Sequence, residues 1–303
     1  MRIRVGLPAL AIALVLGADV YVLTQQDRST AVTLEQAVDH FRATVPDGVS
    51  DQAPAPTTAT TAATAPPASP AGTDGQGRAG EAAARSRSTP GAGAPATAEP
   101  FTVPDEGVYA YRTTGFEEVS LGGGRHDYPS RSFASVRRRG GCDWDVEHQI
   151  LEEHVERSVH CSAPGRFMHS EEQVEVEFYG QKEGSTYRCE PPMVVAQVGD
   201  APGTKRSTTC RSDDGQAVQT TTFLGRERLS VGGSAVDALH VLFEAVISGR
   251  AEGTSRNETW IHPDTGLLLK AVRTSQSRAK AFGTTVDYHE EATFELERLA
   301  PVR

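Results

Sequence analysis

Between Ser50 and Pro100 the chain lacks every large apolar residue: it has no Val, Ile, Leu, Met, Phe, Trp or Tyr. Pro, Ala, Thr, Gly and Ser dominate this stretch instead. Without apolar side chains to bury, nothing offsets the entropy lost when a chain becomes ordered. The sequence therefore predicts a disordered Pro/Ala/Thr-rich linker over residues 49–100, which leaves residues 101–303 for one folded domain.

The signatures of common catalytic and metal sites are also missing. There is no G-x-S-x-G elbow to present a serine nucleophile. Of the nine histidines, only His154 and His160 are placed to share a strand face, and that spacing is too wide for one ion, so we predict surface or turn histidines. Asp143, Asp145 and Glu147 alternate along one segment but lack the glycine-bearing loop of calcium sites, which predicts a solvated strand face. We therefore expect no enzyme, no cofactor and no metal.

Positive charge is scarce relative to negative charge. The net charge is −10, and the domain after Pro100 holds 31 acidic residues (40 minus 9) against 23 basic ones (30 minus 7). An acidic surface repels phosphate backbones, which argues against nucleic acid as a partner. The one basic run, Arg137 to Arg139, precedes two glycines and predicts a solvated hairpin tip.

The N-terminus does contain a long apolar run. Arg2 and Arg4 precede it, and it extends from Val5 to Leu23, or about 28 Å as a helix. These features favour a signal-anchor transmembrane helix over residues 1–25, with the N-terminus in the cytoplasm and the rest of this single-pass chain outside the cell membrane. A signal peptide cleaved after Ala18 is the alternative. A lipoprotein is not expected, because no cysteine occurs before Cys142.

Residues 26–48 contain a helical pattern. Leu34, Ala37, Val38 and Phe41 recur at helical spacing, behind a capping box formed by Thr33 and Gln36. The pattern predicts a short amphipathic juxtamembrane helix. Such a helix would lie on the bilayer, pair with a partner helix or extend the anchor, and the sequence favours none of the three.

The folded domain alternates apolar and polar residues with the period of β-strands. The clearest segments are residues 107–114, 142–150, 174–178, 239–247 and 286–296. Residues 150–160 fit both a helix and a strand, and we favour the strand. Residues 259–269 predict a hairpin, in which Pro263 and Asp264 form the turn and Gly266 supplies a positive φ. The fold class expected is mainly β: an antiparallel meander forming a half-closed barrel or curved sheet.

All four cysteines lie in or near the second half of the chain, at Cys142, Cys161, Cys189 and Cys210. An even set behind a secretory start predicts two disulfides. Three pairings exist, and we favour the sequential one, which closes two loops of about twenty residues and stabilises by roughly 3 kcal/mol each. A zinc site is disfavoured, because zinc ribbons place their cysteines in close pairs.

Several runs carry a family resemblance: residues 107–115, 123–126 with Tyr128 and Pro129, 141–142 with Trp144, 178–180 and 187–189. Together they resemble an uncharacterised family of membrane-anchored, extracytoplasmic proteins of high-GC Gram-positive bacteria. Residues 258–270 are similar to the strand-turn-strand near the end of LolA-like lipoprotein carriers and related mycobacterial lipid-binding lipoproteins. That second resemblance implies a half-barrel around an apolar cavity.

These observations lead to two hypotheses of function. The first is a membrane-tethered binding module of the cell envelope, for a lipid or another apolar ligand, with candidate pocket residues Tyr109, Tyr111, His126, Tyr128, Trp144 and Trp260. The alternative is a structural or interaction domain that meets another envelope protein without any small ligand. A hydrolase acting through His126 and Asp127 comes last.

Overall fold

The computed structural model describes residues 30–44, 101–120, 124–178, 181–281 and 284–303. The predicted anchor at residues 1–25, the predicted linker at 49–100 and both ends of the segment 26–48 lie outside these residues. No helix in the described ranges has the length and apolar character needed to cross a membrane.

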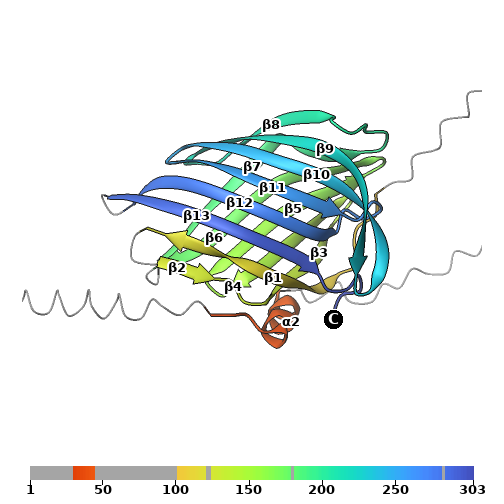
Figure 1. Cartoon of the computed structure of the whole chain (residues 1–303), viewed down its shortest axis with the longest axis horizontal. Helices are drawn as coiled ribbons and strands as arrows, with labels where there is room; N and C mark the ends of the chain where they lie inside the picture. The colour runs from red at the N-terminus through yellow and green to blue at the C-terminus, as the bar shows by residue number, and fades with distance from the viewer. Residues whose placement is uncertain (1–29, 45–100, 121–123, 179–180, 282–283) are drawn as a thin grey trace, which may run out of the picture. The chain divides into compact units, whose positions relative to one another are not determined.

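The domain is built almost wholly of antiparallel strands, as the alternating sequence predicted (Figure 1). They are β1 (Gly107–Val119), β2 (Gly124–Asp127), β3 (Arg131–Gly140), β4 (Asp143–Leu151), β5 (His154–Ala163), β6 (Arg166–Phe178), β7 (Gln181–Gln197), β8 (Lys205–Arg211), β9 (Gly215–Val231), β10 (Ser234–Gly249), β11 (Ala251–Ile261), β12 (Leu268–Ala281) and β13 (Thr284–Leu296). The favoured strand at residues 150–160 is confirmed by β5.

The sheet closes on itself. Each strand from β3 to β13 pairs with the next, β3 pairs with the first half of β1, and nine residue pairs join the second half of β1 to β13, from Tyr111 opposite Leu296 to Val119 opposite Tyr288. Since β2 pairs with β1 alone, twelve of the thirteen strands form the ring. The expected half-closed barrel is therefore corrected to a closed one, in which the first and last strands leave no unpaired edge between them.

One helix, α2 (Leu34–Ala43), packs against the outside of the barrel (Figure 1). The predicted capping box is present: the Thr33 hydroxyl accepts from the Gln36 backbone, and the Gln36 side chain accepts from the Thr33 backbone. The apolar face buries Ala37 and Val38 against a patch of wall formed by Val108, Ala110 and Phe133. None of the three expected roles included this, because a sequence pattern shows that a face is apolar without showing what covers it.

The helix also changes the environment of the acidic segment in β4. Glu147 is only 4% exposed. Its carboxylate oxygens lie 2.7 Å from His40 Nε2 of α2 and 2.7 Å from Arg157 Nε of β5. The prediction of a solvated strand face is therefore wrong at Glu147, because α2 covers it.

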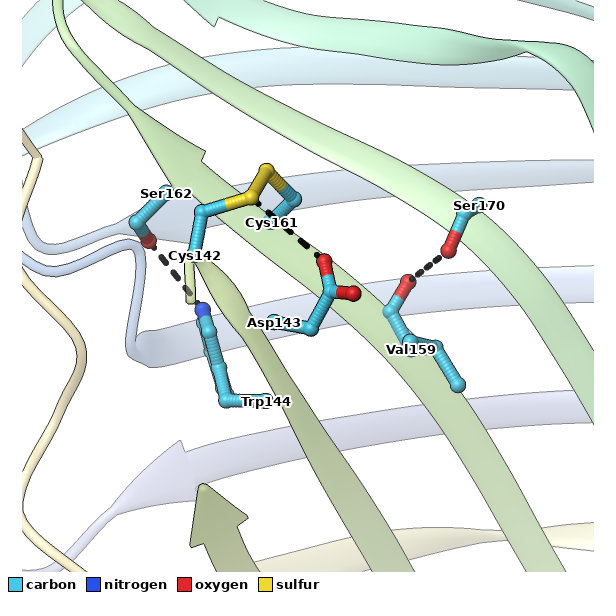
Figure 2. Close-up of a disulfide and its surroundings, with 7 residues drawn as sticks. All are labelled: Cys142, Asp143, Trp144, Val159, Cys161, Ser162 and Ser170. Atoms are coloured by element: carbon cyan, nitrogen blue, oxygen red, sulfur yellow. Dashed lines mark hydrogen bonds between the residues drawn. A yellow bond between two sulfur atoms is a disulfide. The ribbon is translucent and has the colours of Figure 1, made fainter. Parts of the chain in front are cut away.

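Both disulfides have the sequential pairing. Cys142–Cys161 joins the start of β4 to the end of β5, next to a hydrogen bond of 3.1 Å from Trp144 Nε1 to Ser162 Oγ (Figure 2). Asp143 lies close to both sulfur atoms, but a disulfide offers no thiolate for a metal ion. Cys189 and Cys210 sit directly opposite each other on β7 and β8.

One end of the barrel is filled by a core that includes the 261–268 turn. Gly266 has φ +74°, as the predicted hairpin requires, and a Cβ on it would come 2.7 Å from the Phe167 ring. The Phe167 ring in turn lies 6.0 Å from that of Phe101. Glycine is thus required at position 266 both by the backbone conformation and by the close approach of Phe167.

Candidate functional site

The barrel interior contains a cavity of about 600 Å³. This volume lies within the range of small-molecule binding sites, about 300–1,000 Å³. Inward-facing side chains form its wall, and the larger apolar ones are Trp144, Phe167, Met193, Phe243, Ile261 and Phe294. A closed barrel of twelve strands leaves this space because its circumference exceeds what inward side chains of ordinary size can fill.

The two ends of the cavity differ. Trp144, Phe167 and Ile261 line it beside the core that fills one end of the barrel, and we call this apolar part the floor. At the other end the lining reaches the hairpins at Asp214, Arg250 and Lys280, with Arg250 Nη1 3.6 Å from Asp214 Oδ2. The lumen therefore runs from an apolar floor to an end where charged hairpin residues lie beside apolar ones such as Val119 and Val286.

Charged side chains bridge the lumen partway along. Arg273 of β12 places Nη1 2.8 Å from both carboxylate oxygens of Glu156 on β5, and Nη2 2.6 Å from Glu290 Oε1 on β13. In the ring, β5 and β12 are separated by five strand steps in one direction and seven in the other. The Arg273–Glu156 pair thus ties together walls that lie nearly opposite each other.

The bridge continues through His154 to β1. His154 Nδ1 lies 2.8 Å from Glu117 Oε2, and its Nε2 lies 3.3 Å from Glu156 Oε1. Tyr128 lies in the connection between β2 and β3. Its hydroxyl donates to Glu290 Oε1 at a distance of 2.7 Å. Glu117, His154, Glu156, Arg273 and Glu290 together are called the lumen charge cluster below.

The pKa values of these groups follow from burial and pairing. Burial alone would lower the pKa of His154, but its hydrogen bonds to Glu117 and Glu156 outweigh burial and raise it to about 10. Burial opposes ionisation of Glu156, yet Arg273 and His154 hold its pKa below the usual range, and His154 does the same for Glu117. The cluster therefore sets three carboxyl groups against two basic groups, one more acidic group than basic ones.

Three other histidines also face the lumen and are neutral. Burial lowers the pKa of His148 and of His169 to about 4 each, and burial and then His169 lower that of His160. His160 packs 4.7 Å from the Trp144 ring and 5.2 Å from the His169 ring. The prediction of surface or turn histidines is therefore wrong for these three and for His154.

Glu172 is an unusual member of the lining. Its side chain is 41% exposed although it points into the barrel, so the exposure is to the lumen. Its Oε2 lies 4.0 Å from Nε2 of His169. Burial, and then the nearby Glu156, raise the pKa of Glu172.

The structure separates the predicted pocket residues. Trp144 lines the cavity. Tyr128 contacts the lumen charge cluster, and His126 Nδ1 lies 3.7 Å from Glu117 Oε1. The other three lie elsewhere. Tyr109 and Tyr111 are in the core and donate to the carbonyl oxygens of Asp105 and Leu268, and Trp260 stacks on His240 at 4.2 Å and donates to Glu227.

The charge cluster itself is largely absent from the predicted set. A signal for it exists: Glu290 has the same parity on its strand as the apolar residues Tyr288 and Phe294, and Arg273 has that of Leu269 and Ala271. A charge on the apolar face of a strand marks an inward-facing polar group.

No family model matches the chain, and neither does any curated protein. Among solved structures, it is similar to the hypothetical lipoprotein YmcC from Escherichia coli (K12), with 16% identity over 63% of this chain and 85% of that chain, at a TM-score of 0.27. A likeness this distant carries no argument, so the case for function rests on the geometry of the barrel.

Proposed function

We propose that this chain is a membrane-tethered binding module of the cell envelope, whose barrel holds a lipid or another apolar ligand in its lumen. The observation that carries the proposal is the cavity of about 600 Å³ with its apolar floor. A barrel built only to present its outer face to a partner would gain stability from a filled interior, since each unfilled volume costs packing energy.

The disulfides support the proposed location. Disulfides form and persist in oxidising compartments such as the periplasm and the extracellular space, and both bonds lie within the barrel. The anchor proposed for residues 1–25 would hold the barrel at the outer surface of the cytoplasmic membrane, with residues 49–100 as its tether.

The two tryptophans of the chain provide a direct test, because Trp144 lines the cavity and Trp260, which stacks on His240, does not. In a full-length Trp260→Phe protein, held in lipid nanodiscs, only Trp144 emits. A brominated alkyl alcohol, which quenches indole on contact, is expected to quench Trp144 saturably. The Trp144→Phe protein, in which the emission comes from Trp260 away from the cavity lining, should show no saturable component.

A pair of adjacent substitutions locates the ligand. Ser275 of β12 lines the lumen, and the next residue, Gln276, is exposed on the outside. We expect Ser275→Phe to abolish saturable quenching by filling the lumen and Gln276→Phe to leave it unchanged. If the parent protein shows no saturable quenching, the binding proposal fails and the alternative, an interaction domain without a small ligand, replaces it.

A further inference from the structure

The positive charges of the lumen charge cluster are already paired. Arg273 contacts Glu156 and Glu290, and His154 contacts Glu117 and Glu156. A ligand carboxylate or phosphate placed there would meet the surplus carboxylate and would have to displace an existing partner. Both effects cost free energy in a site of low dielectric, so the cluster disfavours an anionic ligand group.

Glu172 presents the opposite situation. Its carboxyl group is open to the lumen, and none of the Lys or Arg residues in the described ranges forms an ion pair with it. Burial and then Glu156 raise the pKa of Glu172, and together they outweigh the lowering by Arg273 and by a hydrogen bond with Gln219. A cationic group entering the lumen would supply a counter-ion.

A second group points to the same place. His169 is 7% exposed, and its Nε2 has no hydrogen-bond partner among the residues that the structure describes. This nitrogen lies 4.0 Å from Glu172 Oε2, a separation that one donor atom about 2.9 Å from each can bridge. Buried polar groups without partners are rare, and here the neutral imidazole offers an acceptor beside the carboxylate.

The apolar floor lies within reach of this pair. Phe167 and Glu172 are five residues apart on β6, which corresponds to about 16 Å along a strand. A ligand with its polar end at Glu172 would therefore have room for an alkyl chain directed toward Phe167 and Trp144.

We infer that the lumen binds an amphipathic amine, with a primary alkylammonium group held between Glu172 and His169 and the alkyl chain lying on the apolar floor. This inference rests on the proposed function and adds the class of ligand. The ammonium donates one N–H to the Glu172 carboxylate and one to His169 Nε2.

The test compares three brominated alkyl probes of one chain length, ending in a primary ammonium, a hydroxyl or a carboxylate, on the full-length Trp260→Phe protein in nanodiscs. The ammonium probe is expected to bind about tenfold more tightly than the alcohol, because it brings a positive charge to the Glu172 carboxylate and the alcohol brings an uncharged donor. The carboxylate probe should bind more weakly than the alcohol.

Glu172→Gln is expected to reduce the preference for the ammonium probe over the alcohol from about tenfold to none. This variant should fold, because it removes a carboxyl that has no cationic partner among the described residues. Its control is Glu171→Gln, the neighbour whose Oε2 pairs with Arg188 Nε at 2.9 Å and which does not line the cavity. Glu171→Gln should keep the preference for the ammonium.

The outcomes separate the two proposals. If the carboxylate probe binds as tightly as the ammonium probe or more tightly, the amine inference is overturned and the proposed binding function is not. Retention of the ammonium preference in Glu172→Gln overturns the assigned site in the same way. If the alcohol also fails to bind, the binding function itself is refuted, and with it the inference that depends on it.

Discussion

Arg273 pairs with two carboxylates inside the barrel, and of these Glu156 also contacts His154 whereas Glu290 otherwise accepts only from the uncharged Tyr128 hydroxyl among the described residues. Its side chain is 14% exposed, and those of Glu156 and Glu290 are 18% and 4% exposed. We expect Arg273→Met to lower the free energy of unfolding by about 3–5 kcal/mol, because it leaves Glu290 buried without its cationic partner. Urea unfolding of the full chain measures this.

Arg278 on the same strand is the matched control for Arg273. It points outward, is 69% exposed and pairs with Asp287 in solvent. Arg278→Met should cause no measurable decrease in the free energy of unfolding, since exposed ion pairs contribute little to stability. Equal stability of Arg273→Met and the parent protein would show that the bridge across the lumen does not stabilise the barrel.

The buried His148 should make the stability of the protein depend on pH in a specific way. Burial lowers its pKa to about 4 in the folded protein, from an ordinary value of 6.5. Between pH 6.5 and 4 the unfolded chain therefore takes up a proton at this residue and the folded protein does not, so the contribution of His148 falls as the pH falls. At most, the loss is about 1.4 kcal/mol per pH unit.

His148→Phe removes that contribution and keeps a ring of similar shape against Tyr111 and Phe294. Unfolding free energies measured at pH 7 and pH 5 should differ less in this variant than in the parent. His154 does not mask the effect: its raised pKa adds stability that is complete below pH 6.5 and is lost only as the pH rises toward 10. An unchanged difference would contradict a neutral, buried His148.

At the scale of elements, the second disulfide lies at a weak point of the ring. Only two residue pairs, Arg188 with Arg211 and Cys189 with Cys210, join β7 to β8, whereas the other disulfide joins β4 and β5, which share eight pairs. Pro191 and Pro192, which lack an amide hydrogen, follow Cys189 on β7. The covalent bond therefore takes the place of a hydrogen-bonded ladder.

We expect replacement of both Cys189 and Cys210 by Ser to open the boundary between β7 and β8, with faster hydrogen exchange in β8 detected by mass spectrometry. The control replaces both Cys142 and Cys161 by Ser and so removes a disulfide that closes a loop of similar length. It should lose a similar free energy, about 3 kcal/mol, without selective exchange in β8. Equal protection of β8 in both proteins would rule out the weak boundary.

The sequence predicts a strand where the strand has its own alternating pattern, and it does not where neighbouring strands impose the pairing. Strict alternation predicted β1, β4, β10 and β13, since one face of each is apolar. The strands β7 and β9 gave no such pattern: β7 contains two prolines, and β9 has Thr220, Thr221 and Thr222 in a row. Their strand pairing is imposed by neighbours in the ring, as tertiary context often overrides local preference.

The site depends on contacts that are distant in the sequence. Glu156 and Arg273 are 117 residues apart, and their contact exists only because the ring brings β5 and β12 to facing walls. Alternation indicates that Arg273 faces inward, but the partner it meets there depends on the number of strands and on closure. The lumen charge cluster therefore could not be assembled from the sequence, although single members carried a signal.

At the scale of the whole molecule, closure depends on a close approach of two backbones. Gly115 has φ +135°, and a Cβ on it would overlap the carbonyl oxygen of Glu291 and lie 2.7 Å from Ala292 Cα on β13. Gly124 also has a positive φ, +64°, but nothing lies within 4 Å of its added Cβ. Both glycines have a positive φ, but only Gly115 is also in close contact with β13. Comparing alanine substitutions at the two positions therefore distinguishes the effect of backbone conformation from that of the contact between β1 and β13.

Gly124→Ala should cost only about 1–2 kcal/mol, the price of a left-handed conformation for a residue with a Cβ. Gly115→Ala should cost more than about 4 kcal/mol, because the same kind of strain is joined by a clash that separates β1 from β13. Thermal unfolding measures both losses, and hydrogen exchange should increase in β1 and β13 of Gly115→Ala alone. Similar losses in the two variants would mean that the ring does not depend on this contact, and a sheet open between β1 and β13 would then describe the molecule better.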